Sequence, residues 1–256
     1  MLKRILVSFV LIPVTILAIL KGDVYFFSMS LILSTFCLWE FYTIFESKDY
    51  YPLKTFSIVV SLLFQTIAYV HGPENIIYFL VFIPMIISLE LFRKKERSII
   101  NPVLAVFGLI YITLPFYLIN ALEKDFRIVL FIVILVWACD SSAYFIGKYF
   151  GKRKLTKISP KKTVEGAIGG FLFTILTAII YHYIQPDFIT LKDALVCGIA
   201  IGISGQIGDL FESMLKRYTE VKDSSQIIPG HGGVLDRLDS LIFVTPLMYI
   251  YFSFMR

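Results

Sequence analysis

The chain has 256 residues, of which 57% are hydrophobic and 17% are charged, and its mean hydropathy is +0.79. Such a chain has too little polar surface to cover a soluble globule of its size, so its composition predicts a membrane protein. The net charge of +5 could indicate a nucleic-acid partner, but the cations lie in loops between apolar runs, as in membrane proteins. We therefore expect no nucleic-acid partner.

Apolar runs follow one another along the whole chain. A membrane-spanning helix needs about 20 mostly apolar residues, and the first and third runs are short by that measure, so the count is eight or nine. The first run lacks a small-residue cleavage pattern and is expected to be a retained helix. The sequence predicts an all-α polytopic membrane protein, a single transmembrane domain over residues 1–256 with about nine spans. These are Ile5 to Leu20, Val24 to Phe45, Phe56 to Val70, Ile76 to Phe92, Val103 to Leu122, Ile128 to Gly147, Gly166 to Ile184, Leu191 to Leu215 and Leu238 to Phe254.

The distribution of Lys and Arg predicts the orientation. With nine spans and a cytoplasmic N-terminus, 19 of the 24 cations lie on the cytoplasmic side and 5 on the other. This assignment puts the loops 148–165 and 216–237 in the cytoplasm, where nucleotides and Mg²⁺ are available. Because acids and glycines crowd into the C-terminal half, we expect residues 126–256 to be catalytic and residues 1–125 to be a scaffold in contact with lipid or another subunit.

The sixth apolar run contains Asp140, Ser141 and Ser142 near its predicted cytoplasmic end. Serines in such a run often make helix-to-helix hydrogen bonds, but an aspartate there needs a cation. Asp140 is therefore a candidate metal ligand.

The loop before the seventh run ends in Ser159-Pro-Lys-Lys-Thr-Val-Glu165. The helix is expected to begin here, with Thr163 as a possible cap and Glu165 in its first turn, so that Lys161 and Lys162 lie beside free backbone N–H groups. A helix N-terminus with adjacent cations favours a phosphate ligand. Topology and anionic lipid headgroups are the alternative explanation for the basic residues of this loop.

The eighth run carries a polar stripe at its C-terminal end, because residues at i, i+3, i+4 and i+7 share one helix face. Two of its members, Glu212 and Lys216, could simply pair with each other. Asp209 would then be left for a metal or a substrate. The members are Asp209, Glu212, Ser213 and Lys216.

The segment between the last two runs contains Pro229-Gly-His-Gly-Gly233. Proline and three glycines rule out helix or central strand, and glycines let backbone N–H groups approach an anion. Alone, this segment is only a turn. Asp236 and Asp239 follow it at i and i+3. They could be ordinary helix-dipole partners, but beside the glycines and Asp209 they favour a hard cation such as Mg²⁺.

These residues together resemble the phosphatidate cytidylyltransferase (CDP-diacylglycerol synthase) family. The Ser-Pro-Lys-Lys-Thr-x-Glu-Gly element and the Asp-Ser-x-Ala-Tyr helix also look like that family, so the resemblance covers about the C-terminal half. The positions that fill the family pattern are Ser213, Lys216, Arg217, Lys222, Asp223, Ser225, Ile228, Pro229, His231, Gly232, Gly233, Val234, Asp236, Arg237, Leu238 and Asp239.

The resemblance implies transfer of a cytidylyl group from CTP to phosphatidate, giving CDP-diacylglycerol and pyrophosphate in phospholipid biosynthesis. It also implies one or two ions of Mg²⁺ or another hard divalent cation, at the cytoplasmic face of a bacterial-type inner membrane. The sequence leaves the choice between monomer and homodimer open. We assign metal ligation to Asp140, Asp209, Asp236 and Asp239. Contacts with the phosphates of CTP and phosphatidate are assigned to Ser159, Lys161, Lys162, Glu165, Ser213, Lys216, Arg217, Lys222, Asp223, His231, Gly232, Gly233 and Arg237, of which Lys216, Arg217, His231 and Arg237 join the four acids as candidate catalytic residues.

Other functions also fit part of the pattern. A CTP-dependent membrane kinase for a polyprenol or phytol would use the same nucleotide, and a cytidylyltransferase could act on an ether lipid. A transporter would need discontinuous helices in two related halves. The concentration of acids and glycines in one half favours a single catalytic site instead.

Overall fold

The structure is a computed structural model that describes residues 2–72, 77–93, 98–230 and 232–256. Within those ranges the chain is helical, and its only extended pairings are isolated bridges between Lys154 and Thr163 and between Ile228 and Gly232. Every predicted apolar run is helical where it is described, except that Phe92 lies in a turn just after α4. Ile76 lies outside the described residues. The predicted all-α class is confirmed.

The helices follow the predicted runs closely, with two runs continuing through a π-helical turn. Their bounds are α1 (Leu2–Lys21), α2 (Asp23–Glu46), α3 (Lys54–His71), α4 (Ile77–Leu91), α5 (Ile100–Gly108), η2 (Leu109–Thr113), α6 (Leu114–Leu122), α7 (Phe126–Phe150), α8 (Val164–Ile184), α9 (Leu191–Tyr218), α10 (Leu235–Ile250) and η3 (Tyr251–Met255).

Seven helical segments of the described chain are long and apolar enough to cross a membrane. They are α2, α3, the continuous segment Ile100–Leu122, α7, α8, α9 and the segment Leu235–Met255. The third run, which looked short in sequence, extends to 18 residues as α3, whereas the apolar described parts of α1 and α4 are shorter. The chain is an integral, polytopic membrane protein.

The chain divides into two compact units. Unit 1 consists of Met1–Lys124 and Tyr218–Arg237, and unit 2 consists of Asp125–Arg217 and Leu238–Arg256. The chain thus leaves unit 2 at the end of α9 and returns to it within the first turn of α10. The segment 218–237, which contains the glycine-rich turn, packs with the N-terminal helices.

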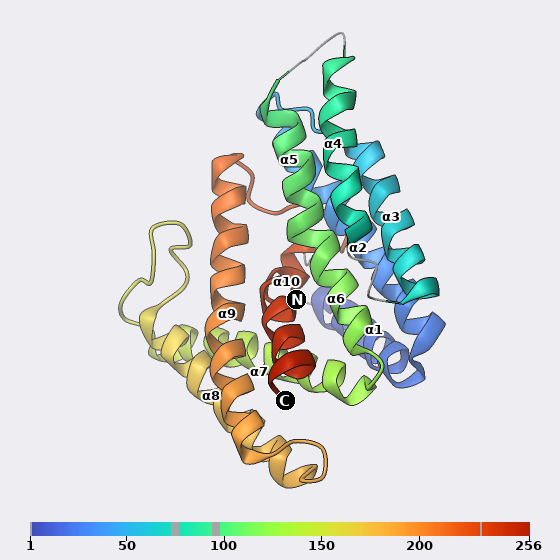
Figure 1. The fold of residues 1–256 in the computed structure, drawn as a ribbon. Helices are drawn as coiled ribbons and strands as arrows, with labels where there is room; N and C mark the ends of the chain where they lie inside the picture. Colours follow the sequence, from blue (N-terminus) through green and yellow to red (C-terminus); the bar gives the residue numbers. More distant parts are fainter. Residues whose placement is uncertain (1, 73–76, 94–97, 231) are drawn as a thin grey trace. The chain divides into compact units, whose positions relative to one another are not determined.

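In unit 1, α2 contacts α3, α5 and α6, which can be followed in Figure 1. The hydroxyl of the buried Tyr42 donates to the Ala105 carbonyl at 2.8 Å. The Gln65 amide donates to Ser34 at 3.0 Å and to Ser61 at 2.9 Å. Hydrogen bonds of this kind join helices in a lipid environment, where apolar contact alone gives no specificity.

In unit 2, small residues let neighbouring helices approach closely. A Cβ at Gly166 of α8 would lie 2.7 Å from the Ala143 carbonyl oxygen of α7. A Cβ at Gly208 of α9 would lie 2.6 Å from the Asp239 carbonyl oxygen of α10. The backbone of α10 at Asp239 therefore lies directly against α9 at the residue before Asp209.

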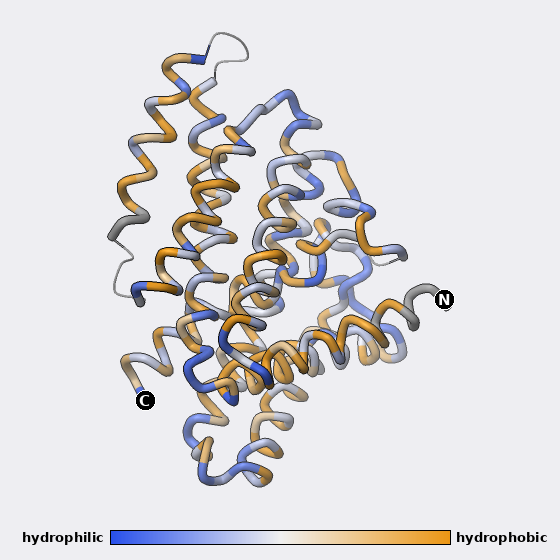
Figure 2. The backbone as a smooth tube through the Cα atoms, turned by 90° about the vertical axis from the view of Figure 1, so that its right-hand side faces the viewer, coloured by the Kyte–Doolittle hydropathy of each residue, from blue (hydrophilic) through white to orange (hydrophobic). Residues whose placement is uncertain are grey.

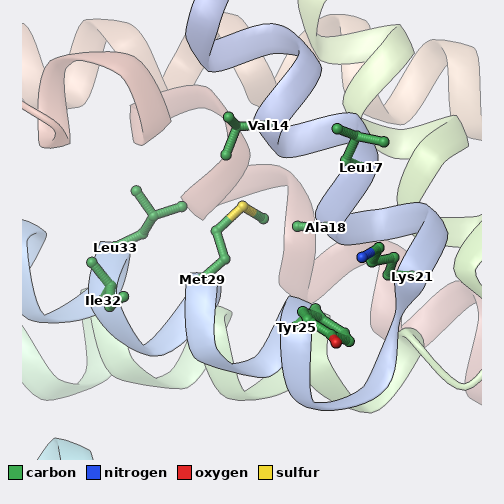
Figure 3. A pocket seen from close by; sticks show the side chains of 8 residues that line it. All are labelled: Val14, Leu17, Ala18, Lys21, Tyr25, Met29, Ile32 and Leu33. Carbon is green, nitrogen blue, oxygen red and sulfur yellow. The ribbon is translucent and has the colours of Figure 1, made fainter.

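The hydropathy of the chain follows this helical architecture. In Figure 2, hydrophobic residues occupy the helices, and hydrophilic residues concentrate in the connections and at helix ends. An apolar cavity of about 450 Å³ lies between α1 and α2, as Figure 3 shows. Lys21 is the cation on its wall, with Nζ 4.7 Å from the Tyr25 ring centroid. The predicted site residues do not line this cavity.

Candidate active site

The loop before α8 is held in a defined conformation by its own backbone. Leu155 N donates to Lys162 O at 2.9 Å, and Val164 N donates to Arg153 O at 2.9 Å. Thr163 caps α8 as expected, because its hydroxyl accepts from Gly166 N at 3.1 Å. Lys162 is thereby fixed next to the first turn of α8. The expected free N–H groups are not found at Val164 and Gly166, because the loop and the Thr163 cap already supply their acceptors.

Glu165, in the first turn of α8, binds the other side of this loop. Its carboxylate accepts hydrogen bonds from Lys152 N at 3.0 Å and Arg153 N at 3.1 Å, and Arg153 Nε lies 3.3 Å from it. These contacts close the loop on the helix. A contact of Glu165 with substrate stays a prediction.

The structure gives Asp209 a partner that the sequence did not identify. Lys162 Nζ lies 2.6 Å from Asp209 Oδ2, which joins the basic loop to α9. Glu212 and Lys216 form the expected i, i+4 ion pair, and both are buried. Two predicted candidates from segments 47 residues apart therefore meet directly, and the polar stripe on α9 is charge-balanced.

The acids of unit 2 share one neighbourhood. Asp239 of α10 is only 6% exposed, and Asp209, Glu212 and Asp140 lie close enough to repel its charge. Ser240 Oγ lies 3.3 Å from Asp140 Oδ1. Three of the four predicted metal ligands, Asp140, Asp209 and Asp239, thus come from α7, α9 and α10 into one electrostatic cluster.

The chemistry of this cluster suits a hard cation. Mg²⁺ usually takes only one or two carboxylates and completes its shell with water and substrate phosphates. Across the part of the chain that the structure describes, no three acidic, His or Cys side chains are arranged to hold one ion by themselves. The donor set therefore fits an ion shared with a phosphate better than a site made of protein ligands alone.

The fourth predicted ligand, Asp236, belongs to unit 1 and organises the glycine-rich segment. Its Oδ2 accepts hydrogen bonds from Gly233 N at 2.8 Å and Ser224 N at 3.0 Å. Gly232 has a φ of +88°, which glycine adopts without strain, and its carbonyl accepts from Ile228 N at 2.9 Å. The segment is therefore a tight turn closed by a carboxylate, and Gly233 N–H already has an acceptor. His231 lies outside the described residues.

Glu40 of α2 is a polar centre that sequence reasoning missed. It is fully buried in unit 1 and accepts hydrogen bonds from Val234 N at 2.9 Å and Leu235 N at 2.8 Å. A signal was present, since an ionisable residue inside an apolar run is a functional candidate by default. Its partners lie 194 and 195 positions away, which no local pattern reveals.

Gly233 has no room for a side chain. A Cβ there would collide with Ser224 Oγ and with the Glu40 carboxyl group. We expect Gly233→Ala to destabilise the protein by about 1–3 kcal/mol, as overpacking does, and to lower its melting temperature in detergent. The control is Gly205→Ala, whose Cβ would meet nothing closer than 3.7 Å. An unchanged melting temperature for Gly233→Ala would contradict this packing.

The structure gives the positions of the remaining candidate residues, and their contacts with substrate stay predictions. Ser213 is buried, and Ser159 N donates to Thr156 Oγ1 at 3.2 Å. Five other candidates, four cations and one acid, are exposed: Lys161, Arg217, Lys222, Asp223 and Arg237.

The sequence is similar to known proteins along nearly its whole length. Residues 2–255 match the pattern of the cytidylyltransferase family. A phosphatidate cytidylyltransferase from Synechocystis sp. is 31% identical over 280 residues, covering 97% of this chain and 95% of the relative. Relatives of the same name from Bacillus subtilis and Staphylococcus epidermidis are 48% and 37% identical over 45% and 65% of this chain. These two matches span 44% and 65% of the relatives' own lengths, which is less than two thirds. The chain belongs to the cytidylyltransferase family.

Proposed function

We propose that this protein is a phosphatidate cytidylyltransferase, an enzyme that converts CTP and phosphatidate to CDP-diacylglycerol and pyrophosphate. The family match and the names of the relatives support the reaction. The observation that carries the proposal in the structure is the Lys162–Asp209 pair next to Asp239 and Asp140. This pair joins a lysine from the basic loop before α8 to a cluster of acids whose oxygens suit a hard cation.

The proposed reaction is a direct displacement. A phosphate oxygen of phosphatidate forms a bond to the α-phosphorus of CTP, and the bond from that phosphorus to the oxygen bridging to the β-phosphate breaks. Pyrophosphate leaves with the electron pair. Because the attacking phosphate is already ionised, no general base is required, and the protein mainly positions two anions and neutralises charge.

The chain's residues divide this work. Lys161 and Lys162, in the loop just before α8, provide cations for phosphate oxygens in unit 2. Lys222 and Arg237 provide exposed cations in unit 1, and His231 is proposed to contact a phosphate. Lys162 also balances the charge of Asp209. The remaining proposed contacts with the substrates are Ser159, Glu165, Ser213, Lys216, Arg217, Asp223, Gly232 and Gly233. The Gly233 N–H donates to Asp236 and would have to exchange that acceptor for a phosphate oxygen.

A divalent cation, with Mg²⁺ the best match, is part of the proposal. The proposed ligands are Asp140, Asp209, Asp239 and Asp236, of which one or two would bind an ion through carboxylate oxygens while substrate phosphates and water complete its coordination. When bound, such an ion polarises phosphate oxygens and stabilises the leaving group. We further propose that the N-terminus and the loops 148–165 and 216–237 lie on the cytoplasmic side of a bacterial inner membrane. CTP is made in the cytoplasm.

The proposal is tested with the purified full-length protein, CTP, phosphatidate and Mg²⁺. We expect pyrophosphate and a cytidine-bearing lipid in equal amounts, loss of both in excess EDTA, and recovery when Mg²⁺ is restored. Release of CDP with a polyprenol or phytol acceptor would indicate a lipid kinase instead. Turnover only with an ether analogue would change the substrate, and no product with any of these lipids would refute the proposal. A trapped nucleotidyl-enzyme adduct would overturn direct displacement.

A further inference from the structure

We propose that Glu40 is a positioning residue that holds the glycine-rich segment, residues 218–237, in its working conformation. This proposal rests on the proposed function, because the segment carries Lys222, Asp236 and Arg237. Glu40 lies in α2, far from these residues in sequence but in the same compact unit. The N-terminal helices would then be part of the catalytic apparatus as well as a scaffold.

The first observation is the number of donors that meet at one buried carboxyl group. Val234 N and Leu235 N donate to Oε1 and Oε2 at 2.9 and 2.8 Å. Ser225 Oγ lies 2.6 Å from Oε1, and Ser224 Oγ lies 2.8 Å from Oε2. A carboxylate that is 0% exposed is tolerated only where several hydrogen bonds replace its hydration. Here those hydrogen bonds come from residues 224–225 and 234–235, on either side of the glycine-rich turn.

The second observation is that two carboxylates share the donors of this segment. Ser224 Oγ lies within hydrogen-bond distance of both Glu40 Oε2 and Asp236 Oδ2. Gly233 N donates to Asp236, and the next two N–H groups donate to Glu40. Three successive N–H groups at the start of α10 therefore have carboxylate acceptors. The direction in which α10 leaves the turn depends on both acids.

The third observation is that the same helix also holds the beginning of the segment. Ser47, at the end of α2, donates to the Thr219 carbonyl at 3.0 Å. Lys48 pairs with Glu220, and this hydrogen bond lowers the pKa of the Glu220 carboxyl below its ordinary value. Tyr50 Oη lies 3.3 Å from Tyr218 Oη. The glycine-rich segment is thus tied at residues 218–220 and at residues 234–235 to one helix and the turn after it.

The decisive variant is Glu40→Gln, which keeps the size of the side chain but replaces one acceptor oxygen with an NH₂ donor. That NH₂ would face at least one N–H or hydroxyl donor that now points at Oε1 or Oε2, so part of the network must break. Ser225→Ala removes a single partner from the same network. The matched control is Glu90→Gln in α4 of unit 1. Glu90 is also buried and also accepts a backbone hydrogen bond, from Ser98 N at 3.1 Å.

Four quantities are measured on full-length protein in detergent: amide hydrogen exchange of residues 219–235, melting temperature, kcat, and KM for CTP. For Glu40→Gln we expect faster exchange at Val234 and Leu235. We also expect kcat per folded molecule to fall about 10- to 100-fold, the size of effect that misplaced catalytic groups produce. Glu90→Gln should lower the melting temperature comparably while its exchange at 219–235 and its kcat stay near wild type. Glu40→Gln and Ser225→Ala together should have less than the sum of their separate effects on log kcat.

The outcomes separate this proposal from the proposed function. If the wild type shows no cytidylyl transfer, the function fails, but the exchange measurement still tests the Glu40 contacts. Unchanged exchange at Val234 and Leu235 in Glu40→Gln would overturn the positioning role. If Glu40→Gln shows faster exchange but wild-type kcat, Glu40 only stabilises the fold. The same conclusion follows if Glu90→Gln loses as much kcat as Glu40→Gln.

Discussion

Asp209→Asn is expected to abolish measurable cytidylyl transfer while the protein still inserts into the membrane and purifies normally. The substitution is isosteric, so the packing of α9 is preserved, but it removes the charge that balances Lys162 at 2.6 Å. It also removes one acid from the cluster around Asp239. Losing one preorganised electrostatic contact costs about 10²- to 10³-fold in kcat, and loss of a metal ligand costs more. Pyrophosphate release per mole of folded enzyme is the measurement.

Asp125→Asn is the matched control for this variant. Asp125 also belongs to unit 2 and pairs with an arginine, Arg127, at 2.7 Å. Hydrogen bonds from the Arg127 side chain hold the pKa of the Asp125 carboxyl below its ordinary value. Asp125 caps α7 about 22 Å along that helix from Asp140, at 1.5 Å per residue, and asparagine is an equally good cap. Wild-type turnover is expected for the control, and near-wild-type turnover in Asp209→Asn would remove Asp209 from the site.

Lys162→Met extends this test to the partner. If the pair acts as a unit, the effects of Asp209→Asn and Lys162→Met on log kcat will be far from additive in the double variant. Additive effects would mean that the two residues act separately on the substrate.

Asp236→Asn is expected to have the second large effect, with turnover falling below detection while the glycine-rich turn stays intact. The amide oxygen of asparagine can take the place of Oδ2 and accept from Gly233 N and Ser224 N. The variant then loses the negative charge and the second acceptor oxygen, while the two backbone contacts of the turn are kept. Because a charged carboxylate is the stronger ligand for a hard cation, the proposed metal role predicts loss of activity even with the turn in place.

Asp236→Ala provides the comparison, since it removes both the charge and the acceptor. Hydrogen exchange at Ser224 and Gly233 should stay slow in Asp236→Asn and become fast in Asp236→Ala. Near-wild-type turnover in Asp236→Asn would leave Asp236 as a residue that only closes the turn. Fast exchange in Asp236→Asn would mean that the turn has opened, so the loss of activity could not be assigned to the lost charge. The metal role would then be tested by comparing the Mg²⁺ dependence of activity in the two variants.

Much of the fold could be predicted because helices in lipid satisfy their backbone hydrogen bonds locally. The apolar runs became helices with nearly the expected bounds, and Thr163 caps α8 as its position before Val164 suggested. The Glu212–Lys216 pair was also foreseeable, since i, i+4 neighbours meet on any helix. The family could be identified from the motif residues and is confirmed over residues 2–255. The roles of the individual site residues stay predictions.

Contacts between distant segments were beyond local reasoning. Lys162 and Asp209 were both candidates, but their ion pair depends on how the loop before α8 meets α9. Glu40 was not a candidate at all, because its hydrogen-bond donors come from residues 224–235, far away in the sequence.

The sequence by itself thus determined the helices, the membrane class and the family, since these depend on composition, on periodicity and on motif residues close together in the chain. Only the tertiary structure decided which charges neutralise one another and which buried carboxyl group holds the glycine-rich turn. The physical reason is that a buried charge must find its partner wherever packing brings one, and packing is a property of the whole folded unit.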